Sequence, residues 1–142
     1  MEPHNNFSDE AFILKFADCS LDPKLFSHEA HLRLAWIYIK NDGVEAAIEK
    51  ISSQIKKFAE HHGAYNKYNL TVTVAAIRTV YHYYINSDCK TFIAFIRAYP
   101  QLKYTFKELL DSHYSMDIFS SEQARKKFIY PDLIPFDTPD KE

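Results

Sequence analysis

The fold of this chain is decided by one stretch, SHEAHLRLAWIYIK, at residues 27–40. Ser27 is suited to cap the start of a helix, and neither proline nor glycine interrupts the residues that follow. One face of that helix would carry residues 28, 31, 32, 35 and 39 toward a core. On another face, we expect Glu29 and Arg33 to pair one turn apart. The stretch therefore predicts a helix that packs against further helices.

The segments that flank this helix show helical patterns as well. The clearest one covers residues 44–62, and Gly63 follows where the left-handed residue that ends a helix belongs. Residues 65–86 include LTVTV, which alternates like a strand. The segment contains no glycine or proline, however, and it is too long for a single strand. We therefore predict one helix across residues 65–86.

Together these patterns predict an all-α fold. We expect one domain, residues 1–142, built as a bundle of about five to seven helices. Prolines after residue 130 predict an extended C-terminal tail, in which Leu133, Ile134 and Phe136 lie against the core. The last residues, 137–142, are polar and are expected to fray.

Composition excludes several classes of protein. The chain has 142 residues, with 17 Lys and Arg against 19 Asp and Glu, so its net charge is −2 and nucleic-acid binding is not expected. It has only two glycines, too few for a glycine-rich phosphate loop. We see no signal peptide and no apolar run long enough to span a membrane. We therefore expect a cytoplasmic protein that contacts neither membrane nor nucleic acid.

His28 and His31 are the most informative polar residues. They lie on the same helical face as Leu32 and Ala35, so both imidazoles are expected to point inward. Burial and the positive end of the helix dipole both disfavour the charged imidazole at this place. A neutral imidazole can bind a metal, act as a base or accept a hydrogen bond. The alternative is a pair of core histidines satisfied by tyrosines or backbone carbonyls.

A second polar group lies in NKYNLTVT, residues 66–73. On a continuous helix, Asn69 and Thr73 would lie one turn apart on the inner face, with Tyr68 beside them. Such an amide and hydroxyl either bind a ligand or tie two helices together. Thr73 could simply bond the carbonyl one turn back, but the two donors and the acceptor of Asn69 need partners of their own.

Sharper catalytic motifs do not occur. HEAH is one residue too short for the HExxH zinc motif, and no GxSxG or paired ExxH is present. His4 is assigned to the polar N-terminal tail. A metal site would have to combine His28 and His31 with remote ligands, among which spacing does not choose: His62, His82, His113, Asp18 and Asp111.

Three stretches, residues 26–39, 63–73 and 114–136, resemble a family of small all-helical bacterial proteins of uncharacterised activity. The family pattern is an HxxHLRLAW helix followed by a segment close to KYHETIT. That pattern implies a centre of three histidines and a glutamate. This chain has Asn69 and Leu70 at two of the four positions, while His28, His31, Thr71 and Thr73 match. The departure weakens the implied metal centre and leaves a ligand site open.

The sequence thus favours a small-molecule-binding protein, or an enzyme of unknown reaction, with a polar site inside a helical bundle. The predicted ligand-binding residues are His28, His31, Tyr68, Asn69 and Thr73. One alternative is a non-catalytic protein-interaction module, with a homodimer as one form of partnership. The other is a metalloenzyme that uses His28 and His31.

Overall fold

The computed structural model describes residues 1–139, apart from the side chain of Tyr65. Within these residues the chain forms eight α-helices and three short 3₁₀ helices, with no strand, which confirms the all-α prediction. The elements, in chain order, are η1 Pro3–Asn6, α1 Asp9–Ala17, η2 Pro23–Leu25, α2 His28–Asp42, α3 Val44–His61, η3 Tyr65–Lys67, α4 Leu70–Tyr84, α5 Phe92–Ala98, α6 Gln101–Tyr104, α7 Phe106–Asp111 and α8 Glu122–Lys126.

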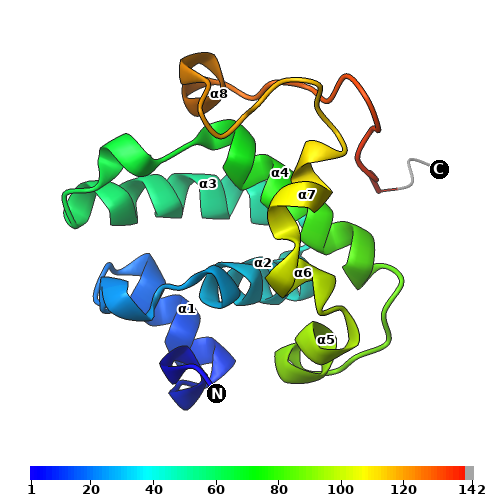
Figure 1. The fold of residues 1–142 in the computed structure, drawn as a ribbon. Helices are drawn as coiled ribbons and strands as arrows, with labels where there is room; N and C mark the ends of the chain where they lie inside the picture. The colour runs from blue at the N-terminus through cyan, green and yellow to red at the C-terminus, as the bar shows by residue number, and fades with distance from the viewer. Residues whose placement is uncertain (140–142) are drawn as a thin grey trace.

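Helices α2, α3 and α4 form the centre of the molecule, and the shorter elements surround them (Figure 1). The prediction of a single apolar face on α2 was too narrow, because ten of its fifteen residues are buried. The N-terminal segment around His4 and Phe7, together with α5 and α6, contacts its remaining faces. Trp36 of α2 is 1% exposed and packs against Phe92 and Phe95 of α5, with ring centroids 6.2 and 6.3 Å apart.

Local capping sets the ends of α2 and α3 as the sequence predicts. The Ser27 hydroxyl accepts a hydrogen bond from the Ala30 backbone N–H, so α2 begins at His28. Gly63 follows α3 with φ +73°, a left-handed conformation that glycine adopts without steric cost. The chain therefore turns sharply after α3 and enters η3.

The prediction of one helix across residues 65–86 is wrong at its beginning. The chain first forms η3, and α4 begins only at Leu70. Asn69 has an extended backbone, and its side-chain oxygen accepts a hydrogen bond from the Val72 N–H. It is thus the N-cap of α4 and does not share a helical face with Thr73, because asparagine at this place competes with the backbone for the first helical donors.

The chain after α7 returns to the start of α4. Thr71 donates from its hydroxyl to the Lys127 carbonyl, and the same oxygen accepts from the Ile129 N–H. A second, smaller core joins α4 to this C-terminal part of the chain and consists of Ala75, Leu110, Tyr114, Ile118 and Ala124. The C-terminal part of the chain therefore holds the first turn of α4 in place.

The segment after α8 is extended, as its prolines predict. Leu133 and Ile134 are each 55% exposed, so the prediction that they lie against the core is wrong. For Phe136 the same prediction is confirmed, because its side chain packs against the second core. Of the predicted frayed tail, residues 140–142 lie outside the described residues. Among those that are described, no helix combines the length and apolar character needed to cross a membrane.

Candidate functional site

A cavity of about 410 Å³ lies between α2, α3 and α4. The five residues predicted from the sequence, His28, His31, Tyr68, Asn69 and Thr73, all lie in its wall. Lys67 and two aromatic residues complete the rim, and the rest of the wall is aliphatic. The apolar wall residues are Leu32, Ala35, Ile51, Ile55, Val72, Ala76, Ile77, Val80, Phe106 and Phe119.

His31 is held in one orientation by two neighbours. Its Nδ1 donates to the Ser27 carbonyl, 2.8 Å away, because a carbonyl can only accept. Its ring also stacks on Phe26, with centroids 3.7 Å apart and planes inclined by 23°. When the imidazole is neutral, Nε2 therefore carries the lone pair and is the nitrogen that can accept a hydrogen bond.

The pKa of His31 is lowered to about 4. Burial among protein atoms is the main cause, and neighbouring His28 adds to it, whereas the bond to the Ser27 carbonyl acts in the opposite direction. By surface area both His28 and His31 are exposed, so the two rings line an open cavity and are not enclosed in the core as predicted. The protein packed around the His31 ring still limits hydration of its charged form. His31 is therefore neutral at physiological pH.

We expect His31 to titrate with a midpoint near pH 4 in the folded chain, measured from its ring ¹³C–¹H chemical shifts. The folded-state pKa lies below the ordinary value of 6.5, so the unfolded chain binds more protons between pH 6.5 and 4. The contribution of His31 to stability is thus complete above pH 6.5 and is lost as pH falls through this window. A midpoint near pH 6.5 would show that the surrounding protein does not disfavour the charged imidazole, and it would contradict this prediction.

His28 also uses one ring nitrogen on a backbone carbonyl. Its Nε2 donates to Leu102, 2.9 Å away, and its ring lies 4.8 Å from that of Phe106. In this tautomer, Nδ1 is left as the acceptor. The sequence left open whether these histidines bind a ligand or bond only within the protein. In each ring, one nitrogen bonds a backbone carbonyl and the other can still accept a hydrogen bond.

The segment from Tyr68 to Thr73 is fixed by contacts with the C-terminal part of the chain. Asn69 donates through Nδ2 to the Ile118 carbonyl, 2.9 Å away, and Arg125 donates through Nε to the Tyr68 carbonyl. Thr73 bonds the Asn69 carbonyl one turn back. Most of the hydrogen-bonding capacity of Asn69 and Thr73 is thus used to build the cavity wall.

The Tyr68 phenol remains a donor. Burial raises its pKa, and the neighbouring Ser52 hydroxyl opposes this shift only in part. The sequence analysis missed Lys67, which also lies in the wall. On a continuous helix, Lys67 and Asn69 would project to nearly opposite sides, whereas the 3₁₀ turn before Asn69 brings both to the cavity. The asparagine cap was the signal that could have revealed the break.

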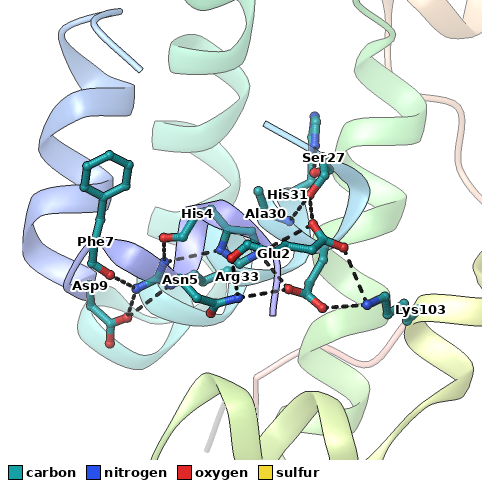
Figure 2. Close-up of polar contacts among 11 residues, drawn as sticks. Glu2, His4, Asn5, Phe7, Asp9, Ser27, Ala30, His31, Arg33 and Lys103 are labelled. Carbon is teal, nitrogen blue, oxygen red and sulfur yellow. Dashed lines mark hydrogen bonds and ion pairs between the residues drawn. The ribbon is translucent and has the colours of Figure 1, made fainter. Parts of the chain in front are cut away.

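The sequence analysis missed a buried polar cluster around His4, Glu29 and Arg33, none of which lies in the cavity wall (Figure 2). His4 was assigned to the tail, but it is completely buried and donates from Nε2 to Glu29, 2.7 Å away. Lys103 bonds the other Glu29 oxygen at 2.9 Å. Burial alone would raise the pKa of Glu29, but the bonds from Lys103, His4 and Asn5 outweigh it and hold that pKa below the ordinary value.

The predicted pair between Glu29 and Arg33 is wrong. Arg33 turns instead to the N-terminal segment, where it donates to the carbonyls of His4 and Phe7 at 2.7 and 2.8 Å and to the Asp9 carboxylate at 2.9 Å (Figure 2). Buried carbonyls and a carboxylate from another part of the chain satisfy the guanidinium more completely than Glu29 alone could. The cluster thereby fastens η1 and the start of α1 to α2.

Among the residues that the structure describes, only Glu2, His4 and Glu29 form a group of three metal-ligating side chains, with ligand atoms within 4.8 Å of one another. The Lys103 ammonium already occupies this group. Neither His28 nor His31 belongs to it. The other proposed partners are dispersed: His62 bonds the Cys19 carbonyl, His82 pairs with Asp137, and His113 bonds the Ile134 carbonyl.

No known protein family, curated protein or solved structure matches this chain. The resemblance stated from the sequence thus stays a prediction. The three stretches that carry it do meet in space, because the cavity wall takes His28 from the first, Asn69 from the second and Phe119 from the third. Whatever this cavity holds, its wall is assembled from parts of the chain that are far apart in sequence.

Proposed function

We propose that this protein binds a small organic molecule in the cavity between α2, α3 and α4. The observation that carries the proposal is the composition of the wall, where His28, His31 and Tyr68 face the same space as a continuous aliphatic surface. A volume of about 410 Å³ lies in the range of small-molecule sites, which combine apolar walls with a few polar groups. The apolar part of a ligand would occupy the aliphatic side, and its polar part would reach the histidines.

The pKa of His31 favours binding over proton transfer. An efficient general base has a pKa near the working pH, and a pKa of about 4 makes His31 a weak base at neutral pH. Its Nε2 is better suited to accept a hydrogen bond from a ligand. The alternative of a metalloenzyme lacks a third ligand beside His28 and His31 among the described residues. The alternative of an interaction module would use exposed apolar side chains such as Tyr130 and Leu133.

A cavity-filling substitution tests this proposal. In the unmodified protein, we expect members of a broad fragment library to shift the methyl NMR signals of Ile51 and Ile77, which lie in the cavity wall. Ala76→Phe should abolish these shifts, because the new ring would occupy the cavity. Ala94→Phe, at an exposed position of α5, is the matched control and should leave them unchanged. Finding no fragment that shifts these signals would refute the proposal.

A further inference from the structure

The charge of the cavity wall is the first guide to the kind of ligand. Lys67 is the one charged side chain among the wall residues, and no Asp or Glu lies beside it there. It is exposed and forms no ion pair with any residue between 1 and 139. A cation at the cavity mouth without a carboxylate partner favours a ligand with a negative group.

One helix end acts in the same direction. Helix α4 begins after its cap Asn69, which lies in the cavity wall, and its first turn has no acidic residue, whereas the first turn of α2 carries Glu29. The N-terminal end of a helix carries a partial positive charge, which stabilises an anion nearby and disfavours a cation. Together with Lys67, the start of α4 gives this side of the wall a positive character.

The histidines impose a different requirement. Nε2 of His31 and Nδ1 of His28 are acceptors, because the other nitrogen of each ring donates to a backbone carbonyl. A carboxylate has no proton to offer them, so with such a ligand only solvent could donate to these nitrogens. The ligand therefore needs a hydrogen-bond donor, such as a hydroxyl, in addition to its negative charge.

Combining these requirements, and resting on the proposed function, we propose that the cavity takes a hydroxylated monocarboxylate with an apolar body. Lys67 and the Tyr68 phenol bind the carboxylate, Nε2 of His31 accepts the single hydroxyl proton, and the aliphatic wall covers the body. The hydroxyl and the carboxylate are both needed, because each satisfies a different set of wall groups.

Four probes with the same ten-carbon chain separate these contributions: 3-hydroxydecanoate, decanoate, 1-decanol and decylammonium. Titrations followed by the Ile51 and Ile77 methyl signals should give the tightest binding for 3-hydroxydecanoate. Loss of either polar group should weaken binding roughly 3- to 10-fold. Decylammonium should bind most weakly, because its charge has the same sign as that of Lys67.

Two variants assign the polar groups. Lys67→Met keeps an unbranched side chain one atom shorter without the charge, and it should weaken both carboxylates roughly 3-fold while leaving 1-decanol unchanged. His31→Phe keeps the stacking on Phe26 and should weaken the two hydroxyl-bearing probes while leaving decanoate unchanged. Lys90→Met, at an exposed position distant from the cavity wall, is the control and should have no effect.

Three failures are distinguishable. If decanoate binds no better than decylammonium, or if Lys67→Met has no effect, the proposed ligand class is overturned, while fragment binding that Ala76→Phe abolishes would still support the proposed function. If 3-hydroxydecanoate shows no advantage over decanoate, the role of the hydroxyl is overturned. If neither these probes nor any library fragment shifts the methyl signals, both proposals fail.

Discussion

Replacing Arg33 by alanine is expected to lower the free energy of unfolding by about 3–5 kcal/mol. The Arg33 side chain is only 6% exposed and donates to the His4 and Phe7 carbonyls and to Asp9. Its guanidinium also lies over the ring of Phe12, 4.7 Å from the centroid. Alanine would leave the Phe7 carbonyl without its donor, and η1 would then be attached to α2 only through the bonds of His4 and Asn5 to Glu29.

Chemical denaturation monitored by far-UV circular dichroism measures this loss. Arg97→Ala is the matched control, because Arg97 is exposed on α5 and its removal should change stability by no more than about 0.5 kcal/mol. Arg33→Lys should recover only part of the loss, since one ammonium cannot reproduce the planar arrangement of donors. A loss below about 1 kcal/mol for Arg33→Ala would show that solvent replaces the cluster readily.

Replacing Asn69 by alanine is expected to lower the free energy of unfolding by about 2–4 kcal/mol. The substitution removes the N-cap of α4 and also the donor to the Ile118 carbonyl, whose residue is completely buried. The sequence left two roles open for Asn69, binding a ligand or tying two helices together, and this expectation follows from the second. The Asn69 side chain is part of the cavity wall, and its hydrogen bonds hold that wall together.

Asn69→Ser separates the two contributions. A serine hydroxyl can cap the helix but is too short to replace the amide bond to Ile118, so roughly half of the loss should remain. Thermal and chemical denaturation of both variants measures the difference. If Asn69→Ala left stability unchanged and altered only the binding of a probe, Asn69 would be a ligand contact, as the sequence suggested.

Local signals carried most of the fold prediction. Ser27 and Gly63 mark helix ends through contacts with neighbouring residues, so the sequence reveals them without knowledge of the tertiary structure. Asn69 carries the same kind of signal, but the absence of glycine and proline between residues 65 and 86 favoured one long helix. The break before Leu70 comes from the local capping by Asn69, but the prediction gave more weight to the uninterrupted length of the segment.

The residues of the cavity were predictable where helical periodicity defines a face. His28 and His31 share the face of Leu32 and Ala35, so their common direction follows from spacing alone. The contribution of Phe119 depends on the return of the C-terminal chain, which no local pattern encodes. The cluster of His4, Glu29 and Lys103 likewise joins residues far apart in sequence, and only the packed structure brings them together.

The position of Trp36 has a practical consequence for spectroscopy. It is the one tryptophan in the chain, and it packs against Phe92 and Phe95 of α5, a helix that contributes no residue to the cavity wall. Its intrinsic emission therefore reports on the contact between α2 and α5. Fluorescence can follow the loss of this core while the methyl signals of Ile51 and Ile77 follow occupancy of the cavity, so unfolding and binding can be recorded independently in the same sample.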